Sequence, residues 1–452
     1  TNGNIVQGNA CRVDWNEVCP HTEEEEILVF GNPPYLGGKL QNQEQKADME
    51  CVFSKFKKYK DLDYISVWFY LGAKYIKGSN AKSAFVSTNS ICQGNQVVLL
   101  WKPIMDNNIK IFFAHHSFKW SNSAKHNAAV ICVIIGMCNK NTKTRYSIYN
   151  NGNMQYVNNI NPYLSSGSAS LISIVSKPIS ILPKGSLGTV PKDDGHLILN
   201  QTEREELLSE YPELNLYIKN FVGSYDFINS HKRWILYIPD NVINTIRRIS
   251  KIDNRLNKVS NFRHSSTEVS TRAIAQVPHK MFFDSYRETE SIIIPRHSSE
   301  RRLYIPIGYL SKECIIADSA NTIPNAPLWT FGVITSEIHM IWVKTVAGRL
   351  KTDYRYSIQL VYNTFPFPKI SEEKKKQIES AAEEVLLCRE DYPDKTLADL
   401  YDPDKMPNNL RQAHHTLDLI VESCYQDKPF ESDEERLECL FKLYEKMTKK
   451  EK

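Results

Sequence analysis

A continuous apolar and β-branched run over residues 128–136 (AAVICVIIG) constrains the fold of this chain most. A run of this kind suits a strand that is buried on both faces of a parallel sheet. The longest apolar stretch, residues 128–137, is about half of the length that a bilayer span needs. The sequence therefore predicts the interior of a soluble sheet protein and no membrane partner.

Short apolar runs alternate with amphipathic segments before this strand. Strands are expected over residues 27–30, 83–87 and 109–114, and helices over residues 44–59, 63–76 and 96–105. Strands that alternate with helices are typical of a doubly wound α/β layer. We expect residues 1–140 to form such an α/β domain.

The composition of the chain changes after Cys138. Asn, Ser, Gly and Pro crowd residues 139–195, which predicts turns and short edge strands. Further strands are expected over residues 234–238, 291–295 and 303–308, so residues 141–368 are predicted to form an α+β domain. Two closely spaced prolines, Pro366 and Pro368, suit neither a helix nor a central strand and end this region.

Three amphipathic stripes follow in residues 369–452. Ser371 is a candidate cap for the first helix, and the stripes repeat at helical spacing around Val385, Leu417 and Leu440. The spacing predicts a small helical domain, either as a bundle of its own or as a cap on the middle domain.

Composition places the chain among ordinary globular proteins. With 41% hydrophobic residues, 24% charged residues and a mean hydropathy of −0.42, it is neither mainly disordered nor fibrous. The ten cysteines form no CxxC pair and no repeating spacing. Free thiols in a reducing compartment fit this pattern, and a cytoplasmic location is expected.

Positive charge is concentrated in the middle of the chain. Residues 231–302 contain fourteen Lys or Arg and seven Asp or Glu, whereas the whole chain has a net charge of only +4. Such a segment is typical of a polyanion-binding face, although a basic face that meets only solvent explains it equally well. The candidates for contact are Lys232, Arg233, Arg263, Arg272, Lys280, Arg296, Arg301 and Arg302. Arg301 and Arg302 are equally candidates for structural pairing with Glu300 or Glu313.

The tetrapeptide Asn32-Pro33-Pro34-Tyr35 follows the first predicted strand directly. Carboxyl ends of strands in an open α/β sheet are where ligands bind. The prolines keep the backbone extended and remove two N–H donors, so the Asn32 amide oxygen and backbone carbonyls remain as acceptors beside the Tyr35 ring. This set suits a planar group with an amino donor, such as a nucleobase, and would stabilise the tetrahedral nitrogen that attacks a methyl group. The alternative is a rigid turn between a strand and a loop.

Asn-Pro-Pro-Tyr after a short strand resembles the signature of amino-group methyltransferases that use S-adenosylmethionine, above all the adenine-specific DNA methyltransferases. Further segments are similar to the MmeI-like branch of restriction–modification enzymes: residues 8–15 (GNACRVDW), 85–91 with Gln93 and Gly94, 114–122 with 128–130, 298–302 with 304–306, and 362–368 (YNTFPFP). The resemblance implies a partial class I (Rossmann-like) methyltransferase core, a target-recognition domain that binds double-stranded DNA, and a helical C-terminal domain.

The resemblance also implies roles for individual residues. Asn32 and the Pro33 carbonyl would accept from the amine of a flipped adenine, with Pro34 holding the loop and Tyr35 stacking on the base. Phe118 or Trp120 would close the base pocket from the other side, although ordinary core packing explains both equally well. Asn9 and Asp14 are candidates for the adenosyl part of the cofactor, with a turn at a strand end as the alternative.

Only 31 residues precede Asn32, and they contain no Gly-x-Gly loop. We therefore expect a C-terminal portion of a methyltransferase whose cofactor pocket is incomplete without an N-terminal half. MmeI-like proteins usually have a nuclease domain at their far N-terminus, and no cleavage is predicted for this chain. Neither His115-His116 nor His414-His415 belongs to a ligand cluster, so no metal site is predicted. The alternatives are an amino methyltransferase for RNA or protein glutamine, and a non-catalytic DNA-recognition fragment.

Overall fold

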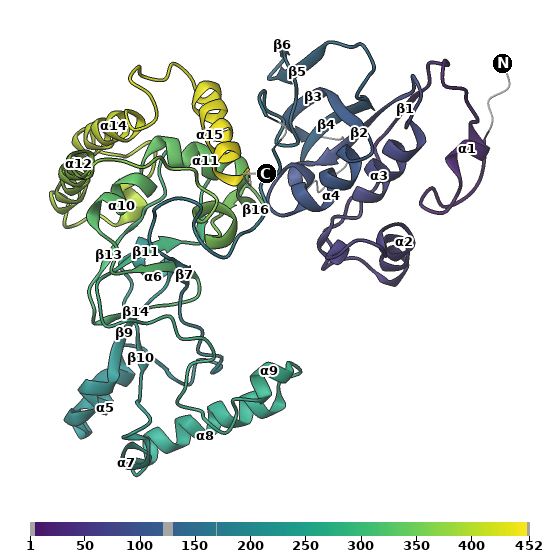
Figure 1. Ribbon diagram of the computed structural model, residues 1–452. Helices are drawn as coiled ribbons and strands as arrows, with labels where there is room; N and C mark the ends of the chain where they lie inside the picture. The colour runs from purple at the N-terminus through teal and green to yellow at the C-terminus, as the bar shows by residue number, and fades with distance from the viewer. Residues whose placement is uncertain (1–4, 121–129, 169, 450–452) are drawn as a thin grey trace. The chain divides into compact units, whose positions relative to one another are not determined.

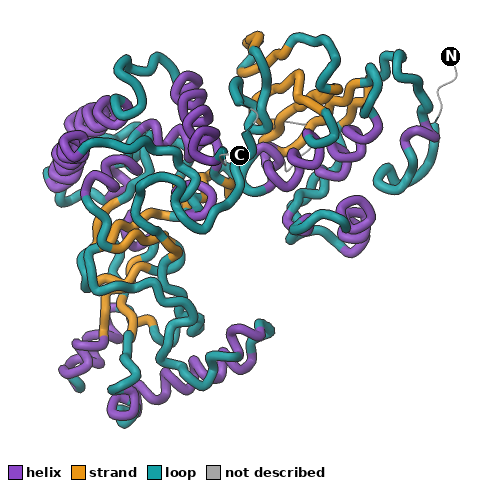
Figure 2. Tube along the Cα trace, in the orientation of Figure 1, coloured by secondary structure: helices purple, strands orange, loops and turns teal. Residues whose placement is uncertain are grey.

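The computed structural model describes residues 5–120, 130–168 and 170–449, which divide into two compact units (Figures 1 and 2). The first unit contains the chain up to Val175, the segment Thr345–Arg349 and the part of the chain from Glu431 onward. The second unit contains Ser176–Lys344 and Leu350–Phe430.

A six-stranded sheet forms the centre of the first unit, in the order β1-β2-β4-β3-β5-β6. Its strands are β1 (Leu28–Gly31), β2 (Lys82–Thr88), β3 (Ile109–Trp120), β4 (Val130–Asn139), β5 (Tyr146–Asn150) and β6 (Asn153–Val157). The sheet therefore continues past residue 140, where the sequence suggested a domain boundary, and the first unit includes the turn-rich segment up to Val175.

The apolar run forms β4, and it lies inside the sheet as predicted. The prediction that this strand belongs to a parallel sheet is wrong, because β4 is antiparallel to both of its neighbours, β2 and β3. Only nine residues separate β3 from β4, fewer than a parallel crossover requires. The beginning of the predicted strand, residues 128 and 129, lies outside the described part of the chain.

The helices of the first unit are α1 (Trp15–Val18), α2 (Gln43–Phe53), α3 (Ser66–Tyr75), α4 (Gln96–Met105) and α15 (Asp433–Thr448). The helix predicted over residues 44–59 ends early, at Phe53, and Lys58 adopts a left-handed φ of 60° directly before the short 3₁₀ turn η1 (Tyr59–Asp61). Fully buried Trp101 of α4 packs against Phe69 of α3, and its indole N–H donates to the Ile91 carbonyl at 2.9 Å. This packing fixes α3 and α4 against the sheet.

The second unit contains two four-stranded sheets, in the orders β14-β9-β10-β8 and β13-β11-β15-β7. Their strands are β7 (Ser186–Leu187), β8 (Ile198–Leu199), β9 (Ile218–Val222), β10 (Trp234–Leu236), β11 (Ser291–Pro295), β13 (Gly308–Leu310), β14 (Cys314–Ile316) and β15 (Ala320–Pro324). The predicted strands near residues 234 and 291 are present as β10 and β11, whereas residues 303–307 are irregular. Two short strands complete this part, β12 (His297–Ser298) and β17 (Asp353–Arg355), whereas most of β16 (Gly348–Leu350) belongs to the first unit.

Helices surround these sheets, which makes the middle region α+β as expected. They are α5 (Gln201–Glu210), α6 (Ser224–Ile228), α7 (Ile243–Ile246), α8 (Ser250–Ser265), α9 (Val269–Arg272), α10 (Leu328–Ile334) and α11 (Glu337–Val346). A core around Leu236, Leu256 and Ile315 joins α8 to the first of the two sheets.

The C-terminal region is helical, as predicted, with α12 (Glu372–Glu390), α13 (Leu397–Leu400) and α14 (Asn408–Glu422) in the second unit. Ser371 caps α12 by accepting from the Lys374 N–H. Both α12 and α14 pack on α10, so they cover the middle region. In the first unit, α15 packs through Phe441 against Tyr163, with the ring centroids 5.7 Å apart. The three amphipathic helices are thus shared between the two units.

Within the described residues, no helix is long and apolar enough to cross a membrane.

A buried carboxyl group links α14 to the middle region and generates a prediction about pH. Asp418 accepts from the Tyr304 hydroxyl and from the Glu337 N–H, both at 2.6 Å, yet burial raises the pKa of Asp418 to about 7. The folded chain therefore holds this proton more tightly than the unfolded chain does. Compared with Asp418→Asn, the wild-type free energy of unfolding is expected to fall as pH rises from about 4 to about 7. Urea titrations of both proteins across this pH range measure the free energy of unfolding. The same pH dependence in both proteins would contradict the prediction.

Candidate functional site

The tetrapeptide Asn32–Tyr35 begins where the parallel ladder between β1 and β2 ends. Gly31 is the last residue of β1 and is in register with Phe85 of β2. Asn32 is exposed, Pro33 is buried, and Tyr35 is half-buried against the core of the first unit. The predicted loop therefore lies at the carboxyl end of a parallel strand, with the Asn32 side chain accessible.

Tyr35 lies near a residue of the central strand. Burial, with smaller contributions from the neighbouring Cys132 of β4 and from Asp63, raises the pKa of Tyr35. Cys132 is in register with Thr88 of β2 on one side and with Phe118 of β3 on the other. The sheet thus brings Phe118 to the same level as Cys132, and the Phe118 ring packs edge-on against His115 at 5.0 Å. The side chain of Trp120 lies outside the described residues.

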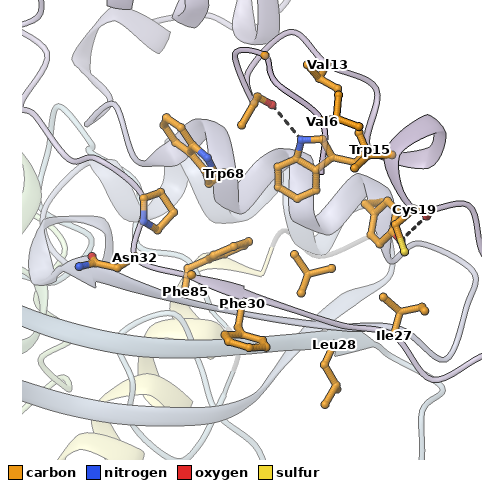
Figure 3. Close-up of a pocket in the computed structure, with 17 residues that line it drawn as sticks. Val6, Val13, Trp15, Cys19, Ile27, Leu28, Phe30, Asn32, Trp68 and Phe85 are labelled. Atoms are coloured by element: carbon orange, nitrogen blue, oxygen red, sulfur yellow. Dashed lines mark hydrogen bonds between the residues drawn. The ribbon is translucent and has the colours of Figure 1, made fainter. Parts of the chain in front are cut away.

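A cavity of about 800 Å³ runs along β1 and ends at Asn32 and Pro33 (Figure 3). Its walls are mostly apolar, and the aromatic rings of Trp15, Trp68 and Phe85 gather on one side of it. The Trp15 N–H donates to the Ala10 carbonyl at 2.9 Å, which fixes its indole in the wall. None of the three was predicted as a cofactor contact, although Trp15 and Phe85 lie in the segments 8–15 and 85–91 that resemble the family.

The two predicted cofactor residues do not line this cavity. The Asn9 amide group donates to both oxygens of Asp48, at 3.2 and 3.1 Å, while its oxygen accepts from the Cys11 N–H. Asp14 caps α1 by accepting from the Asn16 N–H at 2.9 Å. Asn9 thus stabilises a turn before α1 and Asp14 its N-terminus, and no described strand ends there, unlike the strand-end turn considered as the alternative.

Asp48, which the sequence analysis did not single out, accepts the hydrogen bonds that hold this segment. It is buried, and it also accepts from the Tyr64 hydroxyl and from Arg12 Nε, both at 2.7 Å. Burial favours the protonated acid, but the hydrogen bonds from Tyr64, Asn9 and Arg12 outweigh it and lower the pKa of Asp48. An ionised Asp48 thus ties the segment before β1 to α2.

The predicted DNA contacts lie in the second unit and differ in exposure. Lys232, Arg272, Lys280 and Arg301 are exposed, whereas Arg233, Arg296 and Arg302 are half-buried. Several of these side chains already have partners: Arg233 pairs with Asp226, Lys280 with Asp240, Arg301 with Asp404, and Arg272 and Arg296 donate to backbone carbonyls. The suggested pairing of Arg301 with Glu313 is not formed, because Glu313 binds Lys219. Exposed cations of this kind can still exchange their partners for phosphate.

Arg263 must be removed from the set of DNA contacts. Its side chain is fully buried in α8, and its guanidinium donates to five backbone carbonyls, those of Pro191, Lys192, Ile274, Val277 and Lys280. A planar group with five donors satisfies five carbonyls at once, which explains why an arginine stands here. The Arg263 guanidinium links α8 to residues 191–192 and to residues 274–280, and it is not exposed to solvent.

The histidine pairs have structural partners. His116 Nε2 lies 2.8 Å from the Leu164 carbonyl, and buried His414 lies 2.8 Å from the Tyr401 hydroxyl. Within the described ranges, no group of three side chains is arranged to hold a metal ion.

Comparison with known proteins gives three consecutive matches to one family. Residues 1–150 match the DNA-methyltransferase domain of MmeI, residues 166–369 its target recognition domain, and residues 370–451 its C-terminal domain.

Two similar proteins extend this result. DNA methyltransferase A of Bacillus subtilis (strain 168) is 48% identical over 451 residues, which are 100% of this chain and 51% of that protein. The structure of the type IIL restriction-modification enzyme MmeI in complex with DNA matches with a TM-score of 0.88 and 39% identity, over 98% of this chain and 60% of that one. The chain thus spans about half the length of the curated relative that it matches.

The fold and the site define a chain that joins a DNA-methyltransferase domain to a target recognition domain and a helical C-terminal domain. The chain belongs to the MmeI family. This confirms the resemblance inferred from the tetrapeptide, and with it the order of the three regions.

The contrast between Arg263 and Lys232 generates a prediction. Arg263→Lys is expected to lower the free energy of unfolding by about 3 kcal/mol, because a lysine cannot satisfy five buried carbonyls. Exposed Lys232→Ala is expected to leave stability nearly unchanged, to weaken DNA binding, and to reduce the salt dependence of log K by about one. Urea denaturation and binding at several salt concentrations measure both. A wild-type unfolding curve for Arg263→Lys would refute its structural role.

Proposed function

We propose that the protein is a site-specific DNA methyltransferase of a restriction–modification system that transfers a methyl group from S-adenosylmethionine to the N6 amine of a flipped adenine. The observation that carries the proposal is the exposed Asn32 at the carboxyl end of β1, followed by two prolines and a Tyr35 that is half-buried against the core. Membership of the MmeI family supports it.

The chemistry of the acceptors explains the choice of an amine. The lone pair of an exocyclic adenine amine is delocalised into the ring, so the amine is a poor nucleophile. The Asn32 amide oxygen and the Pro33 carbonyl would accept its two hydrogens and favour the tetrahedral nitrogen that can attack a methyl group. Tyr35, half-buried against the core, would stack on the flipped base, a contact worth about 1–3 kcal/mol.

The aromatic cavity along β1 fits the flat part of an adenosyl group. Trp15, Trp68 and Phe85 would contact it, while Asn9 and Asp14 would act indirectly by holding the segment that carries Trp15. When bound, the cofactor supplies an electrophilic methyl group. The rest of the pocket is proposed to come from another part of the protein.

β1 lies at the edge of the six-stranded sheet, which supports the proposal that another part of the protein completes the pocket. Leu28 and Phe30 are 61% and 81% exposed. An exposed apolar edge strand is ready to pair with a further strand. We propose that an N-terminal half of the methyltransferase domain covers this edge, which agrees with a curated relative about twice as long as this chain.

Replacing Asn32 tests the catalytic role. Asn32→Ala is expected to reduce methyl transfer at least about 100-fold, because an acceptor for the developing positive charge is lost, while DNA affinity stays close to that of the wild type. Transfer of labelled methyl to duplex DNA and a gel shift on the same DNA measure the two quantities.

Asn153→Ala is the matched control, since Asn153 is an exposed asparagine on β6 of the same sheet. It is expected to keep both activities. Equal loss of methylation and DNA binding in Asn32→Ala would contradict the catalytic role. Label in RNA or in protein instead of DNA would favour the other amine substrates.

A further inference from the structure

The exit from the tetrapeptide is fixed at Leu36. Pro33 and Pro34 have no N–H, so the loop cannot be held by donors of its own at these positions. The Leu36 N–H donates to Asp63 Oδ1 at 2.9 Å, and the Leu36 carbonyl accepts from the Tyr64 N–H at 3.0 Å and from Gln41 Nε2 at 3.1 Å. The N–H and the carbonyl of Leu36 therefore both have hydrogen-bond partners.

Asp63 is almost completely enclosed, with 5% of its surface exposed. Its Oδ1 also accepts from the Ile65 N–H at 3.3 Å, and its Oδ2 accepts from the Ser90 hydroxyl at 3.4 Å. Ser90 lies in η2 (Asn89–Cys92), directly after β2. One carboxylate thus connects the segments that follow the two parallel strands, β1 and β2.

The chain after Leu36 packs against residues 60–64, the segment that contains Asp63. A Cβ added to Gly38 would lie 2.4 Å from the Lys60 carbonyl oxygen, so only glycine permits this approach. Gln41, also 5% exposed, donates to the Leu62 carbonyl at 3.1 Å as well as to Leu36. Residues 36–41 are therefore docked along the backbone of residues 60–64 through three independent contacts.

We infer that Asp63 is a positioning residue for methyl transfer: by holding the Leu36 N–H it sets the direction in which Asn32 and Tyr35 face the target amine. The inference rests on the proposed function. It follows from the loop's construction, because the loop is anchored at its entry by the β1 ladder and at its exit by Asp63 and its neighbours. Acceptors that must meet a reacting nitrogen tolerate little displacement, and an error of about 1 Å costs on the order of 100-fold in rate.

The test compares Asp63→Ala with Asp63→Asn in the protein as its gene encodes it. Asp63→Ala is expected to lower kcat about 100-fold, with KM for DNA and for S-adenosylmethionine within about twofold of the wild type. Asn retains the Oδ1 acceptor for Leu36, so Asp63→Asn is expected to recover at least about tenfold of the lost kcat. Gln41→Ala removes the side-chain donor to the Leu36 and Leu62 carbonyls but leaves the Asp63 contact with the Leu36 N–H in place, so it is expected to lower kcat less.

Asp193→Asn is the matched control. Asp193 is 4% exposed and accepts from the Leu197 N–H at 2.8 Å in the second unit. Its replacement is expected to reduce stability without changing kcat. Wild-type kcat in Asp63→Ala overturns this inference alone, as does an equal loss of kcat in Asp63→Ala and Asp63→Asn. A wild-type protein that transfers no methyl group overturns the proposed function and this inference with it.

Discussion

Pro33 and Pro34 carry no N–H, so the chain between the end of β1 and Leu36 depends on its surroundings for its position. Three features fix it: a parallel ladder up to Gly31, the Asp63 carboxyl group on the Leu36 N–H, and the Tyr64 N–H and Gln41 side chain on the Leu36 carbonyl. Under the proposed function, the same absence of donors leaves acceptors to meet the target amine. A single local property of the backbone therefore determines both the chemistry of the loop and the contacts needed to hold it.

The second unit illustrates how little charge alone reveals about binding. Arg263 and Lys232 lie in the same basic segment, but one satisfies five buried carbonyls and the other is exposed. Buried cations stabilise the fold only when every donor has a partner, whereas exposed cations contribute little to stability and remain available to phosphate. The basic segment therefore contains both structural and DNA-binding candidates.

Patterns local in sequence were predicted well. The strand before the tetrapeptide, helix α4 and the apolar faces of α12, α14 and α15 depend on spacing along the chain, and the structure has them where they were expected. The direction of β4 was missed because an apolar run shows burial but not the direction of its neighbours. The role of Arg263 was missed, and that of Asn9 was left open, for a related reason: the carbonyls around Arg263 and the Asp48 partner of Asn9 lie 11 to 72 residues away in sequence. Asp63 carried no signal of its own, since its function depends on one N–H that it meets only in the folded chain.

The identity of the methylated atom tests the central claim most directly. Duplex DNA of mixed sequence would be incubated with the protein and labelled S-adenosylmethionine, digested to nucleosides, and analysed by mass spectrometry. We expect label in N6-methyladenine, because the acceptors at Asn32 and Pro33 suit an exocyclic amine and Tyr35 suits a stacked base. Label confined to cytosine, or found in RNA or protein instead of DNA, would contradict this expectation.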